Sequence, residues 1–172
     1  MAEMISPPPA RFLDLGTGAG IPGLVLALEW PAATGTLLDS RARPTAFLTE
    51  TIEELALSDR LEVVTARAED AARDPSHRGT YDLVVARGFA TPAVTAECAV
   101  AFLTEGGRLA VSEPPEGPTE ARWPSEGLAQ LSLEGPEIRK TAGATLAILT
   151  ATTPPNPHWP RKQGRPAKSP LW

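Results

Sequence analysis

A glycine-rich turn near the start of the chain carries the residues with the clearest chemical meaning. The turn follows a short apolar segment that contains an acid, Asp14. Its glycines are Gly16, Gly18, Gly20 and Gly23. Because glycine has no side chain, the backbone of such a turn can approach a flat nucleoside closely. The pattern therefore predicts that a nucleoside cofactor binds at this turn.

Two classes of cofactor bind turns of this kind. Gly18, Gly20 and Gly23 fit the spacing G-x-G-x-x-G, which keeps a nicotinamide or flavin dinucleotide as the alternative. The pyrophosphate of a dinucleotide would need free backbone N–H groups at the start of the helix, and Pro22 has none. Asp14 would repel a phosphate, but it suits the cationic amino group and sulfonium of S-adenosylmethionine. The residues favour S-adenosylmethionine.

Further candidates follow the next strands, because ligands bind beyond the carboxyl ends of the strands in parallel α/β sheets. Asp39 ends the second predicted strand, and its carboxylate can accept hydrogen bonds from both ribose hydroxyls. A helix-capping acid is the alternative for Asp39. After the third strand, the backbone at Ala68 and the carboxylate of Glu69 could bind the adenine edge. Glu69 and Asp70 could instead be surface acids that open a helix.

Arg87 follows the fourth predicted strand, where methyl acceptors usually approach. Its guanidinium could hold the methionine carboxylate or an acceptor phosphate, or it could be a structural ion-pair partner. The Asn/Asp-Pro-Pro-aromatic sequence of amide and exocyclic-amine methyltransferases is not present after this strand. The sequence offers no convincing general base or nucleophile. Methyl transfer to a lone pair such as guanine N7 needs alignment rather than proton removal, so a site of this kind is sufficient.

Alternating strands and helices are predicted to position these residues. This alternation is typical of an α/β fold with a doubly wound, mostly parallel sheet of seven strands, which is a Rossmann-like architecture. The expected parallel strands span residues 11–15, 36–38, 61–65, 81–86 and 108–112, and the expected helices span 22–30, 44–57 and 91–103. Residues 128–133 and 144–151 are expected to be the last two strands, antiparallel to each other.

Composition narrows the class of protein. The 172 residues fit one domain, with no apolar run long enough for a membrane span and no signal segment at the start. Cys98 is the only cysteine, which excludes a disulfide framework and a cysteine-based zinc site, and we expect it to be a buried thiol on a helix. His77 and His158 are too few for a metal cluster or a catalytic triad. We expect a monomeric, cytoplasmic protein without a metal.

The two ends of the chain differ from its body. Residues 1–151 are expected to form the Rossmann-like domain, with 1–10 as an extended lead-in, and residues 152–172 a proline-rich, extended tail. The net charge of −5 argues against a general nucleic-acid coat, but the tail has cations and no acid. These cations are Arg161, Lys162, Arg165 and Lys168. The tail could bind RNA phosphates, or it could be a solvated end.

Five stretches of the sequence resemble the glucose-inhibited division protein B family, whose members methylate guanine N7 in small-subunit ribosomal RNA. They are residues 14–23, 36–40, 67–69, 86–90 and 159–171. The last stretch is the most specific, because composition alone would not produce its order of prolines, cations and glycine. The resemblance implies a class I, S-adenosylmethionine-dependent methyltransferase that acts on 16S ribosomal RNA.

The resemblance also assigns individual positions. Gly16, Ile21, Ala68, Glu69 and Arg87 fall on positions of the family that contact the cofactor. Asp39 falls on the acid that ends the family's second strand.

The sequence departs from the family pattern in three places. The helical segment that precedes the first strand in the family has no counterpart here. The family's Lys-Arg pair is Arg43-Pro44, so Arg43 is the remaining candidate for RNA contact, and a lysine at the end of the fifth strand is Ser112 beside Glu113. Losing a cation there weakens the attraction for RNA phosphates. A non-catalytic, cofactor-binding paralogue and a methyltransferase with a small-molecule acceptor are therefore the alternative functions.

Overall fold

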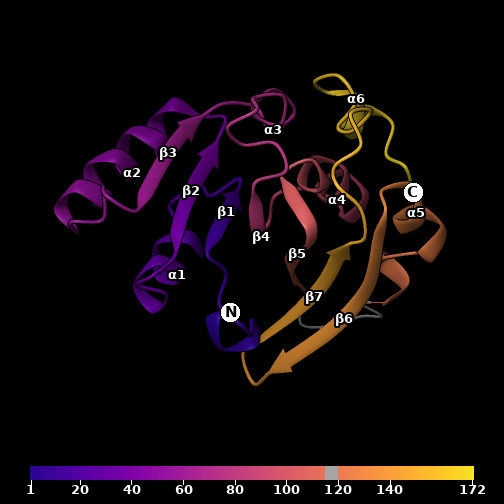
Figure 1. Cartoon of the computed structure of the whole chain (residues 1–172), viewed down its shortest axis with the longest axis horizontal. Helices are drawn as coiled ribbons and strands as arrows, with labels where there is room; N and C mark the ends of the chain where they lie inside the picture. The colour runs from indigo at the N-terminus through magenta and orange to yellow at the C-terminus, as the bar shows by residue number, and fades with distance from the viewer. Residues whose placement is uncertain (115–119) are drawn as a thin grey trace.

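Seven strands form a single sheet in the order β3-β2-β1-β4-β5-β7-β6 (Figure 1). The computed structural model describes residues 1–114 and 120–172. The strands β1 to β5 run parallel to one another, and β7 is antiparallel to both β5 and β6. The strands are β1 (Arg11–Leu15), β2 (Thr34–Asp39), β3 (Leu61–Thr65), β4 (Tyr81–Ala86), β5 (Leu103–Glu113), β6 (Leu133–Thr141) and β7 (Ala144–Ala151). The predicted doubly wound, mostly parallel, seven-stranded sheet is confirmed.

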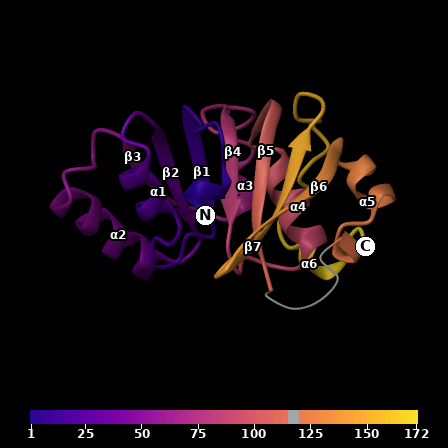
Figure 2. The ribbon, with the colours of Figure 1, turned by 90° about the horizontal axis from the view of Figure 1, so that it is seen from below.

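Helices cover both faces of the sheet, as the view from below shows (Figure 2). The helices are α1 (Gly23–Glu29), α2 (Ala42–Glu54), α3 (Ala68–Ala71), α4 (Pro92–Val100), α5 (Ser125–Gln130) and α6 (Arg165–Lys168), with 3-10 turns at Ala2–Met4 and Glu120–Arg122. Buried residues of α1 and α2 pack on one face, and those of α3, α4 and α5 pack on the other. The strand order reverses between β1 and β4, which places a crevice for ligands at their carboxyl ends.

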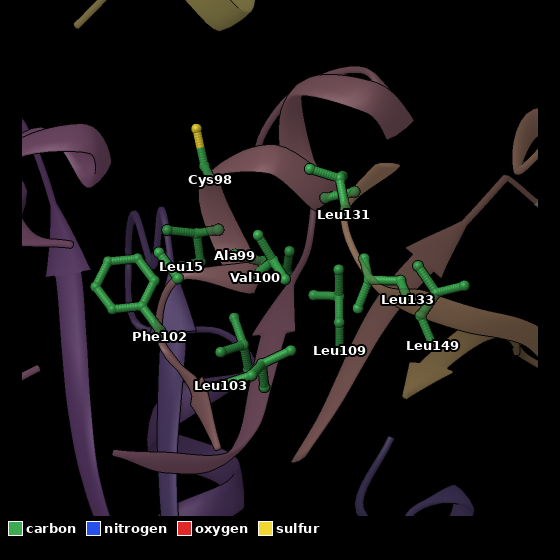
Figure 3. Packing of buried hydrophobic residues seen from close by; sticks show 14 of the residues in the cluster. Leu15, Cys98, Ala99, Val100, Phe102, Leu103, Leu109, Leu131, Leu133 and Leu149 are labelled. Atoms are coloured by element: carbon green, nitrogen blue, oxygen red, sulfur yellow. The ribbon is translucent and has the colours of Figure 1, made fainter. Parts of the chain in front are cut away.

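The central strands are buried on both faces because their side chains alternate between two apolar clusters. On β1, Leu13 and Leu15 pack with α3 and α4, whereas Phe12 packs with α1 and α2. Figure 3 shows the first cluster, in which Phe102, Leu109 and Leu149 lie beneath Cys98 and Val100 of α4. Burying a leucine or phenylalanine side chain contributes roughly 1.5–3 kcal/mol, so this double packing fixes the strand ends that carry the site.

One predicted strand is wrong, and two other elements have limits that differ from the prediction. Of the predicted strand 128–133, only Leu133 is in a strand: α5 ends at Gln130 and β6 begins at Leu133. Leu128 and Leu131 are both buried, and their spacing of three places them on one side of a helical turn, a pattern that a short apolar run cannot distinguish from a strand. The predicted helix 91–103 ends at Val100, and β5 begins at Leu103, well before the predicted residue 108.

The C-terminal segment, residues 152–172, is not an extended tail. It folds back onto α4 and α5 and contains the short helix α6 (Figure 1). Trp159 Nε1 donates a hydrogen bond to the carbonyl of Gln130, and Trp172 Nε1 donates to the carbonyl of Arg122. The prolines of this segment do interrupt regular secondary structure. The two tryptophan hydrogen bonds could not be predicted from them, because the partners lie far away in the sequence. The lead-in likewise begins with a 3-10 turn and buries Met4.

No helix within the two described ranges has both the length and the apolar character needed to cross a membrane.

Candidate functional site

A cavity of about 410 Å³ opens at the carboxyl ends of β1 to β4. We call it the strand-end pocket. Its walls come from the residues that follow each of these strands, together with α4 and α6. They are Leu15, Gly16, Leu38, Asp39, Ser40, Arg41, Ala66, Arg67, Ala68, Glu69, Gly88, Phe89, Ala90, Val94, Cys98 and Ala167. Four predicted cofactor residues, Gly16, Asp39, Ala68 and Glu69, therefore lie in one pocket.

The turn after β1 requires glycine at its first position. Gly16 has a φ of +72°, and a Cβ there would lie 2.5 Å from Cδ2 of Phe89. The backbone N–H groups of Gly16 and Thr17 both donate to the carbonyl of Leu38, at 2.9 and 3.0 Å. These hydrogen bonds fix the turn against β2, so the backbone of Gly16 forms one wall of the pocket.

Asp14 lies beneath the turn and does not line the pocket. Its Oδ2 accepts hydrogen bonds from Thr17 Oγ1 at 2.7 Å and from the backbone N–H of Gly23 at 2.8 Å. Burial raises the pKa of Asp14 to about 6, despite these two hydrogen bonds. The Asp14 carboxylate therefore joins the glycine turn to the first turn of α1, and its predicted contact with the cofactor stays a prediction.

The start of α1 offers no site for a pyrophosphate. Pro22 has no N–H group, the N–H of Gly23 donates to Asp14, and the N–H of Leu24 donates to the carbonyl of Gly20. The structure thus gives a further reason against a dinucleotide. Gly18 and Gly20 shape this turn but are not among the residues that line the strand-end pocket.

Asp39 is the most strongly hydrogen-bonded acid of the pocket. Arg41 binds it in a bidentate ion pair, with Nε 3.0 Å from Oδ1 and Nη2 3.1 Å from Oδ2. The backbone N–H groups of Gly18 and Arg41 also donate to it. Burial opposes ionisation, but the hydrogen bonds from Arg41 and Gly18 keep the pKa of Asp39 below its ordinary value. The carboxylate is therefore ionised at neutral pH and faces the cavity.

Glu69 is buried at the start of α3, whereas its neighbour Asp70 is exposed. Its Oε1 accepts a hydrogen bond from the backbone N–H of Gly164 at 2.9 Å, and its Oε2 lies 3.7 Å from Nε of Arg67. Glu69 is thus not a surface acid, and it ties the C-terminal segment to the pocket. Sequence reasoning missed this contact, because nothing in the pattern of either stretch indicates it.

Several apolar walls of the pocket were also missed. Phe89 lies against the glycine turn, Val94 and Cys98 come from α4, and Ala167 comes from α6. Cys98 is the expected buried thiol on a helix, and burial raises its pKa well above the ordinary range. A protonated, buried thiol is a poor nucleophile, so Cys98 serves as part of the apolar wall.

Ile21 and Arg87 lie away from the strand-end pocket. They line a second cavity of about 640 Å³ between α1 and the β6–β7 hairpin, which we call the hairpin cavity. Ser112 and Lys140 also line it. The structure therefore does not bring Arg87 together with Asp39 around one ligand. Lys140, which sequence reasoning did not consider, places a second cation in the cavity that contains Ser112.

The predicted RNA-binding cations have different surroundings. Arg161 forms a bidentate ion pair with the buried Glu97 of α4, and its side chain is only 18% exposed. Arg161 therefore joins the C-terminal segment to α4, and its predicted RNA contact stays a prediction. Lys162, Arg165 and Lys168 are exposed, and so is Arg43 on α2. These exposed cations remain predictions for RNA contact.

Solved structures with the same fold include several S-adenosylmethionine-dependent methyltransferases. An O-methyltransferase from Thermotoga maritima has a TM-score of 0.63 and 16% sequence identity over 90% of this chain and 64% of its own. A methyltransferase from Aquifex aeolicus has a TM-score of 0.59 and 17% identity over 82% and 81% of the two chains. The sheet order and the glycine turn beside a strand-end acid define the class I S-adenosylmethionine-dependent methyltransferase fold.

Sequence comparison identifies the family within this class. Residues 1–114 match the rRNA small subunit methyltransferase G family, and the chain belongs to it. The ribosomal RNA small subunit methyltransferase G of Prochlorococcus marinus is 36% identical over 170 residues, which cover 94% of this chain and 67% of the relative. That of Moorella thermoacetica is 34% identical over 176 residues, with 96% and 71% covered. The chain thus spans about two thirds of the length of these relatives.

Proposed function

We propose that this protein transfers a methyl group from S-adenosylmethionine to guanine N7 of 16S ribosomal RNA. One observation carries this proposal: the residues that match the family, 1–114, supply nearly all of the wall of the strand-end pocket. Family and site therefore point to the same surface of the molecule. We further propose that the protein acts in the cytoplasm, where its ribosomal substrate is found.

The strand-end pocket fits an adenosine-containing cofactor without a phosphate. Asp39 is ionised and directed into the cavity, where its two oxygens can accept the ribose hydroxyls. The backbone at Ala68 and the carboxylate of Glu69 would bind the adenine edge. The side chains around the adenine would be apolar, from Leu38, Val94 and Cys98. Gly16 lets the chain pass close to the cofactor. When bound, S-adenosylmethionine supplies an electrophilic methyl group on a cationic sulfur.

The chain needs no strong base for this reaction. Guanine N7 carries a free lone pair in neutral guanine, so the protein must align the base and exclude water rather than remove a proton. Phe89 and Gly88 lie at the edge of the strand-end pocket where the acceptor would approach from β4. Arg87, on the other side of the glycine turn, would bind an RNA phosphate.

The RNA-binding surface would consist of cations around the two cavities. Arg165 and Lys168 lie on α6, whose Ala167 lines the strand-end pocket, and Lys162 precedes this helix. Arg43 lies on α2. Lys140 and Arg87 line the hairpin cavity. These local cations would attract phosphates although the net charge is −5. Lys140 lines the same cavity as Ser112, so it could supply the positive charge that is lost at Ser112.

A methyl-transfer assay tests the proposal. Small ribosomal subunits that lack the N7 methyl group are incubated with the protein and S-adenosylmethionine labelled in the methyl group. We expect label in guanine N7 of 16S RNA, and about ten- to a hundredfold less with the Asp39→Asn variant at limiting cofactor concentration. Saturable cofactor binding without transfer would favour the non-catalytic paralogue. Transfer that does not depend on RNA would favour a small-molecule acceptor.

A further inference from the structure

The Asp39 carboxylate is already saturated with hydrogen-bond donors. Its Oδ1 accepts from the backbone N–H and from Nε of Arg41, both at 3.0 Å. Its Oδ2 accepts from the N–H of Gly18 at 2.9 Å and from Nη2 of Arg41 at 3.1 Å. An ionised carboxylate has about four positions for donors. A ribose hydroxyl can therefore reach Asp39 only if one of these donors leaves.

The two donors on the Arg41 side chain are the ones that can leave. The other two belong to the backbone of the glycine turn and of the residue that precedes α2. The Arg41 side chain is 67% exposed, whereas that of Asp39 is 5% exposed, so the guanidinium approaches the carboxylate from the solvent side. We propose that the Arg41 side chain occupies the ribose-binding position on Asp39 in the free protein. When the cofactor binds, its two ribose hydroxyls replace the Nε and Nη2 groups of Arg41 as donors to Asp39. This inference rests on the proposed function, because it requires that Asp39 binds the ribose.

The exchange leaves no acceptor without a donor. Each oxygen of Asp39 loses one N–H donor and gains one O–H donor, while the N–H groups of Gly18 and Arg41 stay in place. An unpaired buried acceptor would cost much more than either hydrogen bond contributes. An ion pair with a largely exposed arginine adds little to stability. Arg41 should therefore moderate cofactor affinity without blocking the site.

The released guanidinium would remain at the entrance of the strand-end pocket. Arg41 directly precedes α2, Arg43 is exposed two residues further on, and Arg67 lines the same pocket. A free guanidinium can bind an RNA phosphate through two parallel hydrogen bonds. Cofactor binding would thus supply one more cation to the RNA. By thermodynamic linkage, bound RNA would strengthen cofactor binding by the same factor.

The first test measures the affinity for S-adenosylhomocysteine by calorimetry. Arg41→Leu keeps much of the bulk of the side chain but removes its N–H groups, and Arg43→Leu removes the same charge two residues away. We expect Arg41→Leu to bind about three- to fivefold more tightly than the wild type, the range for losing an exposed competing ion pair. Arg43→Leu should bind as the wild type does. Equal or weaker binding by Arg41→Leu would overturn the inference.

A second probe separates the exchange from a structural effect of the substitution. The 2′,3′-dideoxy analogue of S-adenosylhomocysteine has no ribose hydroxyls, so it does not compete with Arg41 for Asp39. We expect the wild type and Arg41→Leu to bind this analogue equally. A gain of the same size for both ligands would contradict the exchange. If the wild type binds neither ligand, the proposed function fails, and that result is distinct from a failure of the exchange alone.

The third test measures the coupling to RNA. Affinity for small-subunit RNA is measured with and without S-adenosylhomocysteine at several salt concentrations. The wild type should bind RNA more tightly with the cofactor product, and Arg41→Leu should lose this enhancement. With the product present, the salt dependence of Arg41→Leu should also be shallower by about one phosphate contact. An equal enhancement in both proteins would show that Arg41 does not carry the coupling.

Discussion

Two acids of the site differ in the direction of their pKa shifts, and this difference separates their functions. Asp14 is buried beneath the glycine turn, and burial raises its pKa to about 6. Asp39 faces the strand-end pocket, and although burial opposes ionisation, hydrogen bonds from Arg41 and Gly18 lower its pKa. Asp14 therefore supports the turn, whereas Asp39 presents a negative charge to a ligand.

Replacing Asp39 should weaken cofactor binding directly. Asp39→Asn keeps the size of the side chain but removes its charge and one acceptor oxygen. We expect the affinity for S-adenosylhomocysteine to fall by about 1–3 kcal/mol, the range for charge-assisted hydrogen bonds. Calorimetry measures this loss, and Asp70→Asn, an exposed acid on α3, is the control that should change little. Unchanged affinity in Asp39→Asn would show that Asp39 does not bind the ribose.

Asp14 should give stability an unusual dependence on pH. The pKa of Asp14 is about 6 in the folded protein, whereas the ordinary value of 3.8 applies to the unfolded chain. The unfolded chain therefore loses the proton first as the pH rises. The free energy of unfolding should therefore fall between about pH 4 and pH 6, by up to about 3 kcal/mol from this group. Above that range the loss is complete.

The Asp14→Asn variant isolates this contribution. Asparagine cannot ionise, and its carbonyl can still accept the hydrogen bonds from Thr17 and Gly23. We expect the difference in unfolding free energy between the variant and the wild type to grow from pH 4 to pH 6, as measured by denaturant unfolding. Parallel pH profiles for the two proteins would contradict the burial of an Asp14 that titrates near pH 6.

At the scale of the elements, periodicity predicted the regular parts of the sheet. β3 and β4 have the predicted limits, because each is an apolar run between clear turn signals. The region after β5 was predicted poorly, since Leu128 and Leu131 fit either a strand or one turn of a helix. Parallel strands bring their carboxyl ends together at one edge of a sheet. For this reason the residues that follow the strands could be predicted to lie in one pocket, as they do for Gly16, Asp39, Ala68 and Glu69.

The glycine turn should tolerate no side chain at its first position. Gly16→Ala combines a positive φ with a Cβ only 2.5 Å from Phe89, so Phe89 must move and the pocket wall with it. Gly106→Ala is the matched control, because its φ is +77° but nothing lies within 4 Å of the new Cβ. We expect Gly16→Ala to lose both stability and cofactor affinity, and Gly106→Ala to lose about 1 kcal/mol of stability only. Equal effects on cofactor affinity would contradict the packing of Phe89 on the turn.

At the scale of the whole molecule, the pocket joins residues from both ends of the chain. The N–H of Gly164 donates to Glu69, Arg161 pairs with Glu97, and a Cβ at Gly127 would lie 2.3 Å from the ring of Trp172. No local pattern indicates such partners, so composition alone suggested a detached basic tail. The family resemblance singled out residues 159–171 as its most specific stretch. Only the three-dimensional contacts show that this segment completes the pocket.

Breaking the ion pair between Arg161 and Glu97 should therefore affect stability and cofactor binding together. Glu97 has no exposed side-chain surface, and Glu97→Gln removes the charge that Arg161 binds. We expect a loss of about 3 kcal/mol in unfolding free energy and weaker binding of S-adenosylhomocysteine, because the segment with Gly164 and Ala167 loosens. Glu137→Gln is the control: its pair with Arg139 is 61% exposed on the acid and should cost less than about 1 kcal/mol. Normal cofactor affinity in a destabilised Glu97→Gln would show that the segment is not needed for the pocket.

The central claim is that the strand-end pocket binds S-adenosylmethionine with its ribose on Asp39. A crystal structure of the protein with S-adenosylhomocysteine tests it most directly. We expect electron density in the strand-end pocket, both ribose oxygens within hydrogen-bond distance of Asp39, and the Arg41 guanidinium turned to solvent. Density in the hairpin cavity beside Arg87, or a ribose that leaves Asp39 paired with Arg41, would contradict it.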